Sequence, residues 1–102
     1  MTKSVIVVGA GLGGLSTALR LSYKGYQVTM IEKQALPGGR LHILKKDGFT
    51  FDVGPSFFSM SYEFKELFDS IGESVPFELN ELNPLYTVNM AGSDRVFQIY
   101  KD

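Results

Sequence analysis

Three glycines and one acidic residue near the start of the chain have the types and spacing that could bind a dinucleotide. Gly9, Gly11 and Gly14 form a Gly-x-Gly-x-x-Gly pattern, and Glu32 follows the last glycine by 18 positions. Gly9 would permit a tight turn, Gly11 would let a pyrophosphate approach the backbone, and Gly14 would let a helix lie close to a sheet. Glu32 would accept hydrogen bonds from ribose hydroxyls, and its charge would repel a 2′-phosphate, which argues against NADP.

The elements around these residues are the ones that such a site requires. Ser4–Val8 contains four consecutive β-branched residues and is typical of a strand buried on both faces of a parallel sheet. Leu15–Tyr23 predicts a helix, and Gln27–Ile31 predicts a second strand. The unit therefore predicts a right-handed β-α-β crossover between parallel strands. The N-terminus of its helix would offer unpaired N–H groups and positive dipole charge to a pyrophosphate. A glycine-rich turn in an ordinary α/β domain is the alternative that this context disfavours.

The remaining sequence predicts two hairpins and one amphipathic helix. In chain order these are strands Leu41–Lys45 and Phe49–Val53, a helix from about Tyr62 to Ile71, and strands Leu85–Met90 and Arg95–Tyr100. The last strand has nothing to cover it, and two parallel strands do not make a stable doubly wound sheet. We therefore expect the front of a longer protein, and a small α+β domain closed by the final hairpin is the alternative.

The composition excludes several classes of protein. The 102 residues make one domain at most, and 44% hydrophobic with 21% charged residues excludes a disordered tail. The chain has no cysteine and one histidine, which excludes a thiolate metal site and leaves little room for zinc or a catalytic triad. No apolar run approaches the roughly 20 residues of a membrane span. We expect a cytoplasmic protein without a metal.

The net charge of −1 conceals an asymmetry between the two halves. Residues 1–48 hold seven cations and two acids, whereas residues 49–102 hold three cations and nine acids. A positive first half suits a phosphate-bearing ligand, and an unevenly charged solvated surface explains it equally well. The cations are scattered rather than clustered, so we expect no nucleic-acid partner.

The segment after Glu32 indicates which dinucleotide the chain binds. Leu36-Pro37-Gly38-Gly39-Arg40 resembles the second motif of the FAD-dependent oxidoreductases that include amine oxidases, protoporphyrinogen oxidase and carotenoid desaturases. The resemblance implies that Arg40 lies near the cofactor, and a fixed cation beside two glycines suits a diphosphate. A surface arginine in a loop is the alternative for Arg40.

Three further segments narrow the resemblance to the phytoene desaturase and related carotenoid desaturase family. They are Asp47-Gly48-Phe49-Thr50-Phe51-Asp52-Val53-Gly54-Pro55-Ser56, Glu66-Leu67-Phe68 and Leu82-x-Pro84-x-Tyr86. The resemblance implies FAD as cofactor, hydride transfer from a polyene C–H to the flavin, a lipophilic substrate and association with a membrane surface. Another Gly-Gly-Arg flavoprotein, an NAD-dependent dehydrogenase and a stand-alone nucleotide-binding module are the alternatives.

These observations together predict an α/β fold. We expect a Rossmann-like βαβ dinucleotide-binding unit with added β-hairpins and an amphipathic helix, part of a larger two-domain flavoprotein. Residues 1–72 would form the FAD-binding portion, and residues 73–102 would begin the substrate-domain region. No catalytic acid or base can be assigned. The predicted cofactor contacts are Gly9, Gly11, Leu12, Gly13, Gly14, Glu32, Lys33, Gly38, Gly39, Arg40, Gly54 and Pro55.

For several other candidate residues, a structural role is the simpler alternative to a functional one. His42 could touch the cofactor, although a partly exposed strand histidine is more common, and Asp52 could be functional or could anchor a turn. Four apolar residues after Pro55 could line a hydrocarbon channel, but packing beneath the next helix is favoured because large apolar residues are mostly buried. These four are Phe57, Phe58, Met60 and Tyr62.

Overall fold

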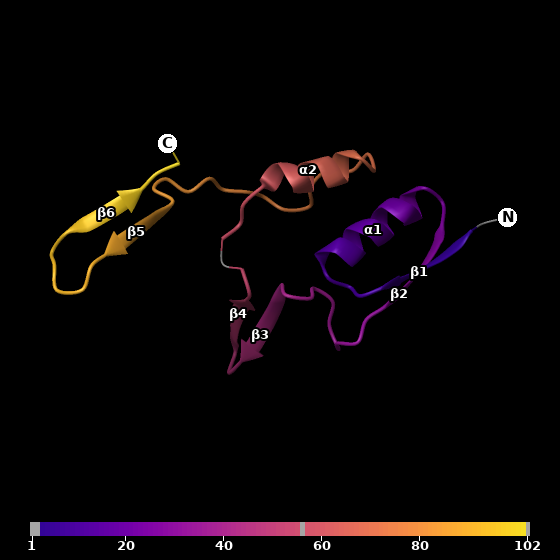
Figure 1. Ribbon diagram of the computed structural model, residues 1–102, viewed down its shortest axis with the longest axis horizontal. Coiled ribbons are helices and arrows are strands. Elements are labelled where there is room, and N and C mark those ends of the chain that lie inside the picture. Colours follow the sequence, from indigo (N-terminus) through magenta and orange to yellow (C-terminus); the bar gives the residue numbers. More distant parts are fainter. Residues whose placement is uncertain (1–2, 56, 102) are drawn as a thin grey trace.

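A computed structural model describes residues 3–55 and 57–101. Ser56, the last residue of the desaturase-like segment, lies outside the described residues. Figure 1 shows the path of the chain. The elements are β1 (Ser4–Val8), α1 (Leu12–Tyr23), β2 (Gln27–Ile31), β3 (His42–Lys46), β4 (Phe49–Val53), α2 (Ser61–Asp69), β5 (Tyr86–Asn89) and β6 (Val96–Ile99).

The first three elements form the predicted βαβ unit. β1 pairs in parallel with β2, with Ser4 opposite Gln27 and Val8 opposite Ile31. Helix α1 begins at Leu12, three residues before the predicted start. The Gly11 carbonyl already accepts a hydrogen bond from the Leu15 N–H at 2.9 Å, so Gly13 and Gly14 lie inside the first helical turn. The predicted parallel strands and connecting helix are therefore confirmed.

Helix α1 covers one face of this two-stranded sheet. Ala18 of α1 is buried, and Val5 and Val7 of β1 are half-buried. On the opposite face, Ile6 and Val8 are 64% and 80% exposed. The expectation of a strand buried on both faces is thus wrong for the part of the chain that the structure describes. The aliphatic sequence makes both faces of β1 suitable for burial, but among the described residues only α1 covers a face of this strand.

The first hairpin follows the connection from β2. β3 and β4 pair antiparallel with His42 opposite Val53, and the two-residue turn between them is Asp47-Gly48. Both turn residues have positive φ, 51° and 82°, as a type I′ turn requires. β3 lies one residue later than predicted, and β4 matches its predicted bounds.

Helix α2 ends two residues before Ile71, the last residue predicted to be helical. Gly72 has φ 71°, and the Glu73 N–H donates to the Phe68 carbonyl at 3.0 Å, so glycine closes the helix as expected. Ile71 is buried after the last turn. Arg20 of α1 donates through Nη2 to both carboxylate oxygens of Glu66, at 3.2 and 3.1 Å, which connects α2 to the βαβ unit.

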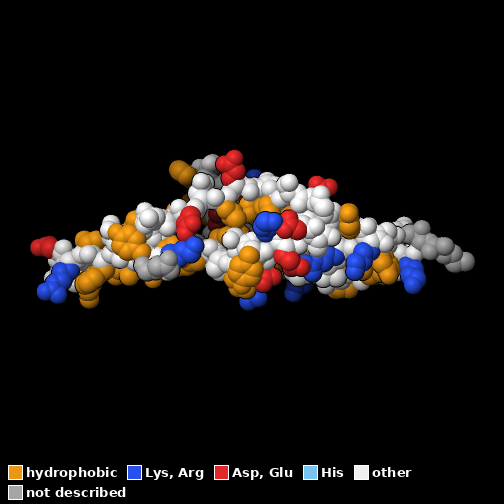
Figure 2. All heavy atoms as spheres, turned by 90° about the horizontal axis from the view of Figure 1, so that it is seen from above, with side chains coloured by type: hydrophobic (Ala, Val, Ile, Leu, Met, Phe, Trp, Pro, Cys, Tyr) orange, Lys and Arg blue, Asp and Glu red, His pale blue; other side chains and the backbone are white. Residues whose placement is uncertain are grey.

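The second hairpin, β5 paired antiparallel with β6, is shorter at both ends than predicted. It lies at the opposite end of the molecule from the βαβ unit (Figure 1). The molecule measures 68 × 35 × 21 Å, and its radius of gyration is 18.9 Å, against about 13 Å for a compact chain of this length. Apolar side chains consequently protrude over much of the surface in Figure 2. Among described residues the buried apolar ones are Ala10, Ala18 and Ile71.

Candidate functional site

The glycine loop, residues 9–14, connects β1 to α1. Gly9 has φ 98°, a conformation that residues with a Cβ rarely adopt, and its N–H donates to the Ile31 carbonyl at 2.7 Å. A Cβ on Gly14 would lie inside contact distance of the Gly9 carbonyl oxygen. The geometry at these two positions is therefore what the sequence analysis assigned to them, a sharp turn and a close approach of helix to strand.

The N-terminus of α1 is open to an anion. Gly11 is its N-cap, with no side-chain hydrogen bond to the cap, and the first turn holds no acidic residue. The N–H groups of Leu12, Gly13 and Gly14 have no helical acceptor, because an α-helix leaves its first N–H groups unpaired. A Cβ on Gly13 would meet no atom within 4 Å. Space, backbone donors and positive dipole charge thus coincide at this turn.

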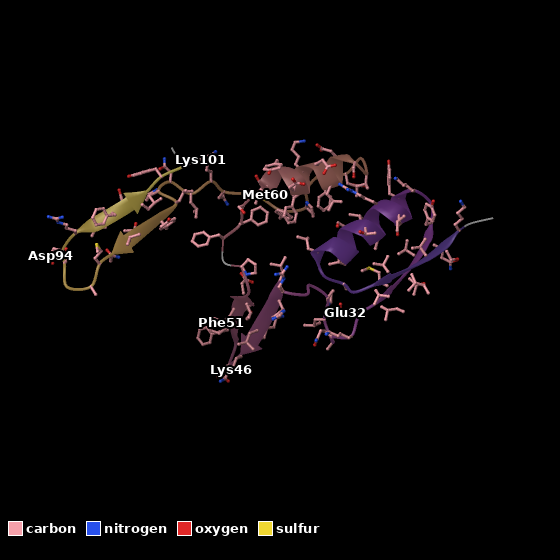
Figure 3. The ribbon with its side chains drawn as sticks, viewed as in Figure 1. Glu32, Lys46, Phe51, Met60, Asp94 and Lys101 are labelled. Carbon is pink, nitrogen blue, oxygen red and sulfur yellow. The ribbon has the colours of Figure 1, made fainter. Side chains whose placement is uncertain are left out.

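Glu32 lies directly after β2 and is half-buried (Figure 3). Its Oε2 accepts a hydrogen bond from the Ala10 N–H at 2.6 Å, and its Oε1 accepts one from the Gln34 N–H at 2.8 Å. The Ala10 bond first, and the Gln34 bond second, hold the pKa of Glu32 below its ordinary value, so the group is ionised at neutral pH. A carboxylate oxygen accepts two hydrogen bonds, so both oxygens keep capacity for ribose hydroxyls.

The second loop, residues 33–41, lies against the glycine loop. The Gly38 N–H donates to the Ala10 carbonyl at 2.7 Å. A Cβ on Gly39 would lie 3.1 Å from the Gly11 Cα, and one on Gly38 would lie inside contact distance of the Leu41 carbonyl oxygen. The two glycines therefore allow close contact between chain segments, a reason that the sequence analysis did not give. Ala10 is not among the predicted contacts, because its only sequence signal is a small residue between two glycines.

Arg40 and Lys33 of the second loop are exposed. The ion pairs among the described residues are Arg20–Glu66, Lys65–Asp69 and Lys101–Glu81, and neither loop cation belongs to one. A Cβ on Gly54 would lie inside contact distance of the Arg40 carbonyl oxygen. Gly54 and Pro55 are thereby brought beside the Gly-Gly-Arg segment, although 14 positions separate Gly54 from Arg40.

The remaining candidate residues either lie apart from the glycine loop or make contacts that account for them without a ligand. His42 is exposed on β3, and its Nδ1 lies within hydrogen-bond distance of the Gly39 carbonyl. Asp52 lies within β4 rather than in a turn. Among the four apolar candidates, Phe58 packs near α2, with its ring 5.0 Å from that of Phe64, while Phe57 stands edge-on to Tyr86 at 5.8 Å. All four residues are more than half exposed. Of the four, Phe58 comes nearest to the predicted packing beneath α2, through its contact with Phe64.

Residues 3–55 and 57–101 contain neither a candidate metal site nor a helix able to span a membrane. That part of the chain has no group of three or more His, Cys, Asp or Glu side chains that could hold a metal ion. Over the same residues, no helix has the length and hydropathy needed to cross a membrane. A shallow hollow along α2, lined by Ser61, Lys65 and Phe77 among others, contains none of the predicted cofactor contacts.

Comparison with known proteins agrees with this geometry. The chain is 52% identical over 73 residues to a 4,4′-diapolycopene oxygenase of Methylomonas sp, covering 72% of this chain and 15% of that protein. It is 40% identical over 94 residues to a 4,4′-diapophytoene desaturase of Staphylococcus aureus, covering 90% of this chain and 19% of that enzyme. The chain thus spans less than a fifth of these relatives, whose names confirm the resemblance to carotenoid desaturases. The profile of one family matches residues 7–72, and the chain belongs to that family, the NAD(P)-binding Rossmann-like domains.

Proposed function

We propose that this chain is the FAD-binding part of an oxidoreductase of the carotenoid desaturase type. The observation that carries the proposal is the position of the Glu32 carboxylate, 2.6 Å from the Ala10 nitrogen and therefore beside the open N-terminus of α1. This arrangement offers a pyrophosphate its donors and a ribose its acceptor at adjacent points. The Gly-Gly-Arg segment and the similarity to desaturases favour FAD over NAD.

The residues of the chain fit this cofactor in distinct roles. The N–H groups of Leu12, Gly13 and Gly14 would donate to the pyrophosphate, and Glu32 would accept from the ribose hydroxyls. The exposed cations of Lys33 and Arg40 would lie near the diphosphate. The remaining assigned contacts are Gly9, Gly11, Gly38 and Gly39 along the two loops, and Gly54 and Pro55 towards the flavin ring.

When bound, FAD supplies a hydride acceptor, and the protein supplies position and a dry environment. The diapophytoene desaturase of S. aureus suggests 4,4′-diapophytoene or a similar linear polyene as the hydride donor. Because such a lipophilic substrate resides in lipid, we expect the enzyme to act at the cytoplasmic face of a membrane. Residues 1–72 would hold FAD, and residues 73–102 would begin the substrate-binding region. No side chain of this chain is assigned a catalytic role.

The test uses the full-length protein. Protein purified without added cofactor should be yellow, and denaturation should release FAD and no nicotinamide dinucleotide. With 4,4′-diapophytoene in lipid vesicles, it should form products of longer conjugation, detected as a red shift of the polyene spectrum. Flavin without polyene conversion would favour an amine oxidase or protoporphyrinogen oxidase type of activity. A colourless protein that binds NAD would contradict the proposal.

A further inference from the structure

Ala10 lies at the centre of a set of contacts between the glycine loop and the segments that follow β2. The residue as a whole is only 5% exposed. Its N–H donates to Glu32 Oε2 at 2.6 Å, and its carbonyl accepts from the Gly38 N–H at 2.7 Å. Both polar backbone groups of Ala10 are therefore bonded to residues more than 20 positions away. One position earlier, the Gly9 N–H is bonded to the Ile31 carbonyl.

The glycines of the second loop allow these bonds to form. Gly11 and Gly38 pair as an isolated parallel bridge, which holds the two loops side by side. A Cβ on Gly39 would lie 3.1 Å from the Gly11 Cα, closer than ordinary van der Waals contact, and Gly39 has φ 62°. A side chain at this position would push the second loop away and lengthen the bond between Gly38 and Ala10.

We infer that Glu32, Gly38 and Gly39 are positioning residues that hold the glycine loop in its binding conformation before any dinucleotide binds. This role is separate from the ribose and diphosphate contacts proposed above, and it does not depend on which dinucleotide binds. A loop that is already ordered loses less conformational entropy on binding. Glu32 can serve both purposes because each of its oxygens has a second acceptor site.

The test measures amide hydrogen exchange in the ligand-free, full-length protein. In Glu32→Gln, the amide presents one oxygen and one NH₂ group, so a donor would face the N–H of either Ala10 or Gln34. We expect exchange at Ala10 and Gly38 to accelerate about tenfold or more, as befits the loss of a hydrogen bond to a charged group. Glu63→Gln is the matched control, because Glu63 lies in the first turn of α2 and should leave both amides unchanged.

A second pair of variants tests the close contact of the loops. Gly39→Ala and Gly92→Ala each add a Cβ at left-handed backbone, φ 62° and 77°, but at Gly92 no atom lies within 4 Å. Only Gly39→Ala should accelerate exchange at Ala10 and Gly38. This comparison decides the question if Glu32→Gln does not fold. Unchanged exchange at Ala10 in both Glu32→Gln and Gly39→Ala would overturn the inference. A failure to bind FAD would not overturn it, because the exchange is measured on ligand-free protein.

Discussion

The carboxylate of Glu32 accepts a hydrogen bond from the backbone N–H of Ala10, 22 positions earlier in the chain. The contact follows from the sheet: Val8 lies opposite Ile31, so the residues after both strands emerge at the same edge. Ligands of open α/β sheets bind outside the carboxyl ends of the strands. One pairing register therefore places an acidic side chain next to the open end of α1.

Gly11→Val should abolish the retention of FAD while the protein stays folded. Gly11 has φ −75° and ψ 179°, an extended conformation that valine adopts freely, and a Cβ there would lie at an ordinary 3.9 Å from the Gly39 Cα. The γ-methyl groups of valine would occupy the space in front of the helix N-terminus. Flavin content per polypeptide and far-ultraviolet circular dichroism measure the two effects.

Ala91→Val, in the exposed turn between β5 and β6, is the control for Gly11→Val and should retain its flavin. Undiminished flavin in Gly11→Val would contradict the role assigned to that residue.

Gly14→Ala should destabilise the protein by about 2 kcal/mol or more, as overpacking against rigid backbone does. The added Cβ would lie inside contact distance of the Gly9 carbonyl oxygen, so strand or helix must shift. Gly13→Ala, which meets no atom within 4 Å, should preserve stability or raise it, because alanine favours helix over glycine by about 1 kcal/mol. Thermal denaturation compares the two variants, and equal melting temperatures would contradict the close packing of α1.

Glu32 should stabilise the folded protein only while it is ionised. The hydrogen bond from Ala10, followed by that from Gln34, lowers the pKa of Glu32 below its ordinary value of 4.5. The unfolded chain therefore takes up a proton first as the pH falls. The contribution of Glu32 to stability is complete above the unfolded pKa and is lost as the pH falls through the folded pKa.

Melting temperatures of the wild type and Glu32→Gln over a range of pH measure this dependence. Their difference should be constant near neutral pH and should shrink as the pH falls towards 4.5 and below it. A difference that already shrinks near neutrality would show that another group is responsible.

The ion pair between Arg20 and Glu66 should contribute little to stability. The side chains are 45% and 66% exposed, so water and salt screen their attraction. A double-mutant cycle of Arg20→Ala and Glu66→Ala should give a coupling energy of about 1 kcal/mol or less, decreasing with added salt. A larger, salt-independent value would contradict a weak pair that solvent screens.

Local chemistry explains how far the sequence predicted the fold. Asp47-Gly48 predicted the first hairpin because few residue pairs accept two positive φ angles, and both are observed. Gly72 predicted the end of α2 for a similar reason. The exposed face of β1 was not predictable, because the apolarity of Ile6 and Val8 records an ability to be buried and does not identify the segment that buries them.

The candidate site was predicted by residue type but only partly by contact. The roles of Gly9, Gly14 and Glu32 could be predicted from residue type, because the first two require the absence of a Cβ and the third requires a carboxylate. The bonds of Ala10 involve backbone groups, which every residue except proline possesses, so no side-chain pattern could reveal them. The residue types of Gly38 and Gly39 predict a ligand contact, which stays a prediction, but they do not identify the chain segments that lie close to both glycines in the structure.

Amide exchange in the full-length protein, with and without saturating FAD, tests the location of the dinucleotide most directly. The N–H groups of Leu12, Gly13 and Gly14 should gain protection on binding, because the free helix leaves them without acceptors. Ala10 and Gly38, already bonded, should change little. Protection confined to other segments, with residues 12–14 exchanging as fast as before, would contradict binding at the junction of β1 and α1.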